Sequence, residues 1–229
     1  MEGCKPVSTP IPLHFKLQAV KGNLPEEEAD YMKKVPYSNA VGSLMYAMIS
    51  TRPDIAYGVS LVSRFMCNPS KEYWSAVKWV LRYLKGSVNK GLVFRSNAEN
   101  SSSIKGYCDF DFATDLDKRR SLSGYVFTLG GNVISWKANL QHIVALSTTE
   151  AEYVTLTEAM KEAIWLQGIV RELGLVDVSY IHILLILGLL SVRIVSLVAL
   201  PWLPSGLLFV PGLLIDQDGV LWSAFHLGV

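Results

Sequence analysis

The hydrophobic period of this chain changes at Gly86, and this change limits the fold more than any other feature of the sequence. Before Gly86, apolar residues recur at the spacing of amphipathic helices. After it, short segments alternate in the period of two that strands show, until a helical period returns. The expected helices cover residues 37–50, 51–67, 71–86 and 148–173, and the expected strands cover residues 91–94, 104–112, 124–129 and 133–137. Helices followed by an antiparallel meander and one long helix predict an α/β protein.

Composition excludes several classes of protein. Half of the residues are hydrophobic, so the chain is not globally disordered. The net charge of +1 shows no overall basic bias towards nucleic acid. Three distant cysteines, Cys4, Cys67 and Cys108, form no CxxC pair and predict neither a zinc knuckle nor a disulfide framework. Because no apolar run follows the N-terminal prolines, we do not expect a signal peptide.

The chain divides into four segments. Residues 1–34 are punctuated by proline and end in a charged stretch, which predicts an extended segment with little core of its own. Residues 35–100 hold the first helices, and residues 101–177 hold the meander and the long helix. Residues 178–229 form a hydrophobic tail that is poor in charge.

Two carboxylates share one face of the strand expected at residues 104–112. Side chains alternate along a strand, so Asp109 and Asp111 point to one side and Cys108 points to the other. Like charges on one face repel each other unless solvent or a cation relieves the repulsion. A solvated strand end is one interpretation, and a hard divalent cation bound by carboxylate oxygens is the other.

The long helix begins with a capping box. Ser147 is followed three residues later by Glu150, which gives Glu150 a structural role. Glu152 instead heads the apolar stripe of the helix, where a carboxylate needs a partner because an unpaired buried charge is costly. This stripe continues through Leu156, Ala159, Ala163, Leu166 and Val170. We expect the stripe and the Asp109 face of the strand both to point inward, bringing the two carboxylates within about 4–6 Å.

Three cations and one histidine complete the candidate residues. Lys118, Arg119 and Arg120 lie in the loop after the first meander strand, where they would meet phosphate oxygens near an active site. A solvated hairpin loop is the alternative for them. His142, between a strand and the long helix, is expected to be a surface residue and not a catalytic one.

Four motifs follow one another in the second half of the chain: GYCDFDFA (106–113), SLSGYVF (121–127), ISWK (134–137) and ALSTTEAEY (145–153). In order and spacing they resemble the ribonuclease H domain of copia-type retrotransposon Pol polyproteins. Upstream stand YSNAVGSLMY (37–46), TRPDI (51–55), NPS (68–70) and LRYLKG (81–86), which resemble the family's connection between reverse transcriptase and ribonuclease H. Residues 1–10 resemble the end of the reverse transcriptase itself, so the resemblance covers about residues 1–175.

The resemblance implies an RNase H-like fold, a mixed sheet with helices packed on it. It implies hydrolysis of the RNA strand of RNA·DNA hybrids during reverse transcription, with two Mg²⁺ ions held by acidic side chains. Asp109 matches the first carboxylate of the family, Glu152 matches the second, and Asp111 would be auxiliary. The hybrid would be recognised through groove shape and 2′-hydroxyl contacts. No small-molecule cofactor is implied, and the implied location is cytoplasmic or nuclear.

The sequence departs from the family pattern in two places. The paired aspartates of a reverse transcriptase core are not in this sequence. After Leu175 the family has a strand with a third aspartate, whereas residues 178–185 hold no carboxylate here. The tail resembles the readthrough of a shifted frame or of an intron. We therefore expect a truncated copy that is weakly active or inactive.

The tail itself gives three expectations. Residues 178–185 are β-branched and apolar enough to add a strand beside the Asp109 strand. Residues 186–229 should then lack a defined partner for their apolar surface, which favours aggregation or membrane association. Residues 181–200 approach the length that a bilayer needs, although Arg193 would be costly there. A membrane-anchored or structural protein that reuses the fold remnant is therefore the alternative to a ribonuclease.

Overall fold

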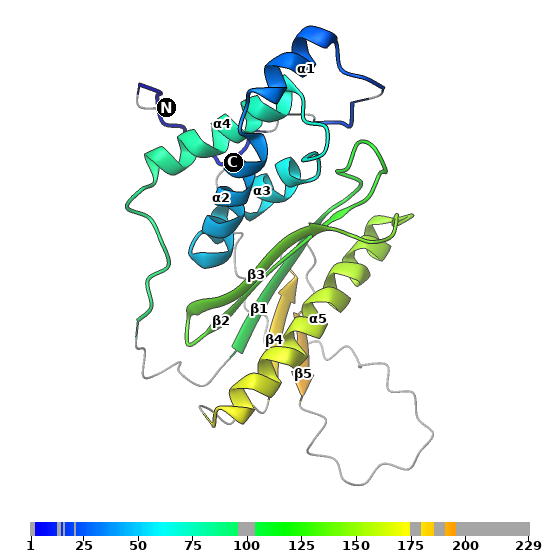
Figure 1. Cartoon of the computed structure of the whole chain (residues 1–229). Helices are drawn as coiled ribbons and strands as arrows, with labels where there is room; N and C mark the ends of the chain where they lie inside the picture. The colour runs from blue at the N-terminus through cyan, green and yellow to red at the C-terminus, as the bar shows by residue number, and fades with distance from the viewer. Residues whose placement is uncertain are drawn as a thin grey trace.

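The structure is a computed structural model, and it describes residues 3–12, 15, 17–20, 22–95, 104–174, 180–185 and 191–195. Within these residues the chain has the α/β class expected from its sequence. A group of helices from the first half of the chain lies beside an open sheet, and one long helix crosses the sheet (Figure 1).

The helices of the first half share one apolar core, and we call them the helical segment. They are α1 (Glu26–Lys33), α2 (Tyr37–Ser50), η1 (Pro53–Ile55), α3 (Ala56–Ser63) and α4 (Lys71–Gly86). Their fully buried side chains include Leu44, Ile55, Val62, Tyr73 and Val77. The three helices expected here are confirmed, but the second begins as a 3-10 turn at Pro53 and ends at Ser63, not at residue 67.

The N-terminal 34 residues have more structure than the sequence indicated. The helix α1 carries three glutamates in its first turn and Lys33 in its last, which complement the helix dipole. Met32 of α1 and Leu17 are both buried in the core of the helical segment. Closer to the N-terminus, the Thr9 carbonyl accepts a hydrogen bond from Trp79 Nε1 of α4 at 3.0 Å. The expectation of an extended segment is therefore wrong for α1, whereas the described residues before α1 form no helix or strand. The two buried side chains pack in the core of the later helices, so the segment has little core of its own, as expected.

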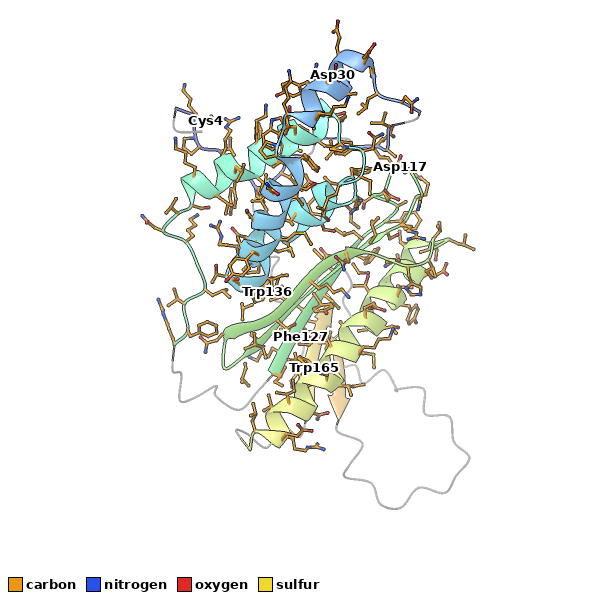
Figure 2. The ribbon with its side chains drawn as sticks, in the orientation of Figure 1. Cys4, Asp30, Asp117, Phe127, Trp136 and Trp165 are labelled. Carbon is orange, nitrogen blue, oxygen red and sulfur yellow. The ribbon has the colours of Figure 1, made fainter. Side chains whose placement is uncertain are left out.

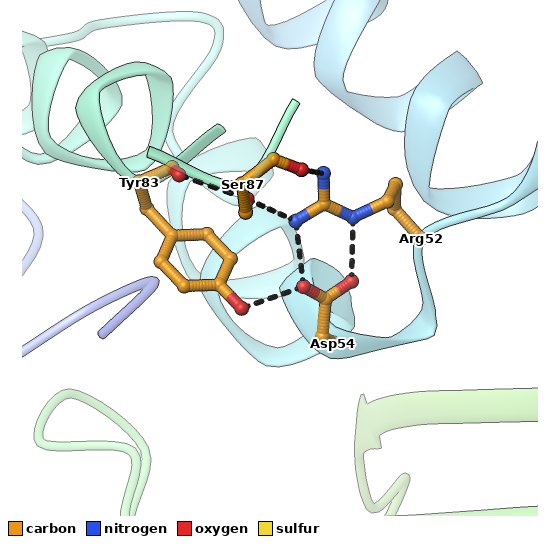
Figure 3. A network of polar contacts seen from close by, with 4 residues as sticks. All are labelled: Arg52, Asp54, Tyr83 and Ser87. Carbon is orange, nitrogen blue, oxygen red and sulfur yellow. Dashed lines mark hydrogen bonds and ion pairs between the residues drawn. The ribbon is translucent and has the colours of Figure 1, made fainter. Parts of the chain in front are cut away.

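A buried arginine joins the turn after α2 to the end of α4 (Figure 3). Arg52 is 7% exposed and donates to both carboxylate oxygens of Asp54, at 2.9 and 2.7 Å. It also donates to the Ser87 carbonyl at 3.2 Å and to the Ser87 hydroxyl at 2.6 Å. The Tyr83 hydroxyl donates to Asp54 Oδ2 at 2.7 Å. Thr51 directly follows the last residue of α2.

The second half of the chain forms a five-stranded mixed sheet in the order β3-β2-β1-β4-β5. The strands are β1 (Ile104–Asp111), β2 (Leu122–Leu129), β3 (Asn132–Leu140), β4 (Tyr180–Leu185) and β5 (Ser191–Val195). The first three form the expected antiparallel meander, and β4 runs parallel to β1. The predicted strand beside β1 is thus confirmed. The strand expected at residues 91–94 does not form.

The helix α5 (Thr148–Glu172) packs on one face of this sheet (Figure 1). Its buried line consists of Ala151, Thr155, Ala159, Ala163, Leu166 and Val170. The core beneath it includes Ile104, Cys108, Phe127, Ile181 and Ile183. The predicted stripe is confirmed from Ala159 onward, but in the first two turns its centre is Ala151 and Thr155, with Glu152 and Leu156 at its flank.

The helical segment contacts the opposite face of the sheet at β3. Trp136 Nε1 donates to the Met48 carbonyl of α2 at 3.0 Å, and Figure 2 shows Trp136 below α2. Its neighbour Ser135 points the other way and donates to Glu162 of α5 at 2.6 Å. The strand β3 is therefore held between the helical segment and α5.

The tail adds a fifth strand to the sheet. Residues 191–195 form β5, which pairs antiparallel with β4 through the backbone. The expectation that the apolar surface of residues 186–229 lacks a partner stays a prediction. The sequence SVRIV is β-branched, which favours a strand. The other residues of the tail after β4, residues 186–190 and 196–229, lie outside the described residues. Over the described part of the chain, no helix is long and apolar enough to cross a membrane.

Candidate functional site

Asp109 and Asp111 lie at the C-terminal end of β1, on the strand face opposite to Cys108. The alternation is confirmed, because Cys108 is buried in the core under α5 while Asp111 is exposed. Asp109 is half-buried, and its Oδ1 accepts a hydrogen bond from the Phe110 N–H at 2.8 Å. Burial raises the pKa of Asp109 above its usual value, and the Asp111 charge raises it further against the effect of the Phe110 bond. A cation beside Asp109 would relieve the free-energy cost of its buried negative charge.

The face of β1 that meets α5 is not the one we expected. The Asp109 face was expected to point towards the helix stripe, but α5 packs on the Cys108 face, where Ile104 and Gly106 are also buried. Apolar and small side chains exclude water from the contact between β1 and α5, and two carboxylates in their place could not do this. The approach of the Asp109 and Glu152 carboxylates to about 4–6 Å stays a prediction.

The Cys108 thiol lies within electrostatic reach of both carboxylates. Burial raises the pKa of Cys108 to about 11, and the charges of Asp109 and Glu152 add to this effect. Asp109 acts from the next residue in β1, and Glu152 acts from α5. Both charges therefore act on the buried thiol, but Glu152 is not among the groups that shift the pKa of Asp109.

The first turn of α5 separates the roles of its two glutamates. Ser147 Oγ accepts a hydrogen bond from the Glu150 N–H at 3.1 Å, and Glu150 Oε2 accepts one from the Leu146 N–H at 2.7 Å. This confirms the capping box and the structural role of Glu150. Glu152 is half-buried, and its Oε1 is buried without a hydrogen-bond partner among the described residues. An orphaned carboxylate oxygen is costly, so Glu152 Oε1 is a candidate ligand for a cation.

The acidic set at this site is small. Within the described ranges, no group of three or more His, Cys, Asp or Glu side chains is placed to hold a metal ion. The neighbouring strand β4 presents Leu184 on the Asp109 face, because Ile181 and Ile183 are buried under α5. The described residues of β4 therefore add no carboxylate to Asp109 and Glu152.

A buried polar network next to this site was missed by the sequence analysis. Gln141, 3% exposed, has its Nε2 within hydrogen-bonding distance of the Ser123 hydroxyl (3.0 Å) and the Ala151 carbonyl (2.8 Å). The hydroxyls of Ser123 and Thr155 lie 2.6 Å apart. The network ties the start of α5 to β2 and to the end of β3, and so fixes where Glu152 stands. A polar Thr155 in the apolar stripe was the only signal of it in the sequence.

The loop between β1 and β2 carries the three candidate cations. Lys118 and Arg119 are exposed, so both can meet an anion from solvent. Arg120 is half-buried, its Nε is buried without a hydrogen-bond partner among the described residues, and its carbonyl accepts from the Asp115 N–H at 3.0 Å. His142 is exposed, as predicted for a surface histidine.

The chain is similar to the retrovirus-related Pol polyprotein from transposon TNT 1-94 of Nicotiana tabacum, with 53% identity over 79% of this chain. It is 37% identical over 75% of its length to the retrovirus-related Pol polyprotein from transposon RE2 of Arabidopsis thaliana. The aligned part spans only 13% and 11% of these two polyproteins.

A shorter relative is covered almost completely. The secreted RxLR effector protein 161 of Plasmopara viticola is 47% identical over 59% of this chain, and the alignment covers 94% of the effector. No protein-family description matches the chain, and no solved structure matches it.

Proposed function

Because this chain belongs to the copia-type retrotransposon Pol polyproteins, we propose that its sheet and α5 form an RNase H-like domain that binds RNA·DNA hybrids and cleaves their RNA strand weakly. The relatives' names describe whole polyproteins, of which this chain matches a small part. The activity therefore rests on the site in β1, α5 and the loop after β1.

One observation carries the proposal. Glu152 Oε1 is buried without a hydrogen-bond partner in the described part of the chain, on a helix whose position the Gln141 network fixes. A buried carboxylate oxygen with no protein donor fits a cation. Asp109, whose charge is disfavoured by burial and by Asp111, supplies the second carboxylate at the end of β1.

These two residues would hold a single Mg²⁺ ion. When bound, the ion would activate a water molecule and stabilise charge on the phosphate. Asp109 and Glu152 would fix its place, and Asp111, exposed two residues further along, would assist from the strand end. Lys118 and Arg119 would contact the backbone phosphates, and Arg120 would contribute mainly by shaping the loop.

We expect the cleavage to be slow. The two-ion arrangement that stabilises both the attacking and the leaving oxygen needs a further carboxylate near its centre. The described residues of β4 supply none, since Leu184 occupies the Asp109 face of that strand. A bound single ion can still orient the hybrid.

The experiment is a comparison of hybrid binding and cleavage by the full chain and by Asp109→Asn. We expect binding of the hybrid, slow Mg²⁺-dependent cleavage of its RNA strand, and loss of that cleavage in Asp109→Asn. Double-stranded DNA of the same sequence is the control substrate and should stay intact. Cleavage that survives Asp109→Asn, or no binding of the hybrid at all, would overturn the proposal.

A further inference from the structure

We propose that Arg64, from the end of α3, is a positioning residue that holds the basic loop between β1 and β2 in place for nucleic-acid phosphates. The inference rests on the proposed function, since it presumes that Lys118 and Arg119 meet a hybrid backbone. The inference gives the helical segment a part in the contact between these two residues and the hybrid backbone. Arg64 forms an ion pair with Asp115, and neither residue was a candidate functional residue in the sequence analysis.

Asp115 is the centre of the loop. It is 6% exposed, and its Oδ2 accepts a hydrogen bond from the Lys118 N–H at 3.0 Å. Its backbone N–H donates to the Arg120 carbonyl at 3.0 Å, and its carbonyl accepts from the Arg119 N–H at 2.8 Å. Every one of the three candidate cations is therefore bonded through its backbone to Asp115. A displacement of Asp115 would displace all three.

Arg64 reaches this centre from the helical segment. Its Nη1 lies 3.7 Å from Asp115 Oδ1, and the two side chains are 17% and 8% exposed. Arg64 Nη2 is buried and has no hydrogen-bond partner in the described residues. The guanidinium is thus turned inward to Asp115 and is covered from solvent. This geometry suits a residue that holds the loop and does not suit one that contacts phosphate itself.

The loop has a second attachment to the first half of the chain and a backbone that needs support. Asp117 Oδ2 accepts a hydrogen bond from the Ala19 N–H at 2.7 Å, and Figure 2 shows Asp117 on the loop that reaches the helical segment. Ala113 and Arg119 have φ angles of 52° and 55°, which are left-handed values that side chains other than glycine rarely adopt. Such backbone persists where surrounding contacts hold it.

The test is a double-mutant cycle on hybrid affinity as a function of salt, without divalent metal. Each phosphate contact adds about 0.9 to the slope of log affinity against log salt concentration. We expect the loop variant Lys118→Gln/Arg119→Gln to lose about 1.8 of this slope, or two contacts. Arg64→Gln alone should lose a similar amount, and combining it with the loop variant should cause no further loss. Arg64→Lys, which keeps the charge near Asp115, should retain most of the slope.

Matched variants control for charge and for folding. Lys161→Gln removes an exposed lysine of α5 and should leave the slope unchanged. If Arg64→Gln does not fold, Asp115→Asn takes its place, since the amide oxygen can still accept from the Lys118 N–H while the charge pair is lost. Circular dichroism checks that each variant is folded.

Two sets of outcomes separate this inference from the proposed function. Additive losses, or an unchanged slope in Arg64→Gln, Asp115→Asn or the loop variant, would overturn the positioning role. A hybrid that binds as described but whose cleavage ignores Asp109→Asn would overturn the proposed function and leave the positioning role standing. A chain that binds no hybrid would overturn both.

Discussion

Tyr107 of β1 and Leu184 of β4 are register partners in the parallel pair, so Leu184 stands on the sheet face that carries Asp109. The resemblance to the copia-type family implies an aspartate on the strand that follows the long helix. This chain forms that strand, pairs it with β1, and presents an apolar side chain that is 40% exposed. The strand expected beside β1 is thus present without the carboxylate that the resemblance implies.

A carboxylate at this position should strengthen the site. Leu184→Asp adds a third acidic side chain to the face of Asp109, and more carboxylate ligands bind a hard cation more tightly. We expect Mg²⁺ affinity to rise roughly tenfold, about 1.4 kcal/mol, with faster cleavage of the hybrid. Isothermal titration calorimetry measures the affinity, and Leu184→Asn is the uncharged control. Equal Mg²⁺ affinities in Leu184→Asp and Leu184→Asn would contradict the placement of residue 184 on the Asp109 face.

The contact between β1 and β2 should be sensitive to one methyl group. A Cβ at Gly106 would lie 2.4 Å from Phe127 Cε1, in the core under α5. Gly106→Ala should therefore destabilise the fold by about 2 kcal/mol through overpacking. Gly168→Ala, in α5 with no atom within 4 Å of its Cβ, should instead stabilise by about 0.5–1 kcal/mol. Urea denaturation measures the stability of both variants. A Gly106→Ala variant as stable as the wild type would refute the close packing of Gly106 against Phe127.

The Arg52 network should make the stability of the chain depend on pH. Burial alone would raise the pKa of Asp54, but hydrogen bonds from Arg52 and Tyr83 leave it below its usual value. The contribution of Asp54 is therefore present above about pH 4 and is lost as the pH falls further. Asp54→Asn should cost about 2 kcal/mol at pH 7, less than for a fully buried pair because Asp54 is 36% exposed.

Denaturation at pH 7 and pH 3 tests this expectation. The difference between wild type and Asp54→Asn should shrink at the lower pH, since protonation removes the same charge in the wild type. Asp30→Asn, whose ion pair with Lys33 is exposed, should change the stability little at either pH. A constant difference between pH 7 and pH 3 would show that the Arg52 pair carries no charge-dependent stability.

Cysteine reactivity should report the burial at the end of β1. Cys108 is 1% exposed and its pKa is raised to about 11, first by burial, so little thiolate forms near pH 8. Cys67 is exposed. We expect iodoacetamide at pH 8 to modify Cys67 in the folded chain and Cys108 only after unfolding, as mass spectrometry of the peptides would show. Rapid modification of native Cys108 would place β1 outside the core.

Local patterns made part of this fold predictable. The capping box at Ser147 and Glu150 marked the start of α5, because capping depends on residues three positions apart. Strand alternation placed Asp109 and Cys108 on opposite faces of β1 correctly. The β-branched residues after Asp177 predicted β4, although they gave no sign of β5 beyond it.

Contacts between distant parts of the chain were beyond the sequence patterns. Which face of β1 would meet α5 depended on Phe127 and Ile183, which pack there from other strands. Arg52 pairs with Ser87, 35 residues away, and Arg64 pairs with Asp115, 51 residues further along. Such pairs leave no periodic signal, so neither arginine was a candidate. The helix α1 was missed because its residues are mostly polar, and only Met32 is buried.

The most direct test of the account is a titration with Mn²⁺, a paramagnetic substitute for Mg²⁺, followed by nuclear magnetic resonance of the backbone amides. The account predicts that signals of Asp109 and Glu152 broaden first and together, with one ion bound per chain. Binding should weaken as the pH falls through the raised pKa of Asp109, because protons then compete with the metal. It should disappear in Asp109→Asn and persist in Glu150→Gln. Broadening centred on another part of the chain, or binding unchanged in Asp109→Asn, would contradict the claim that Asp109 and Glu152 share one metal site.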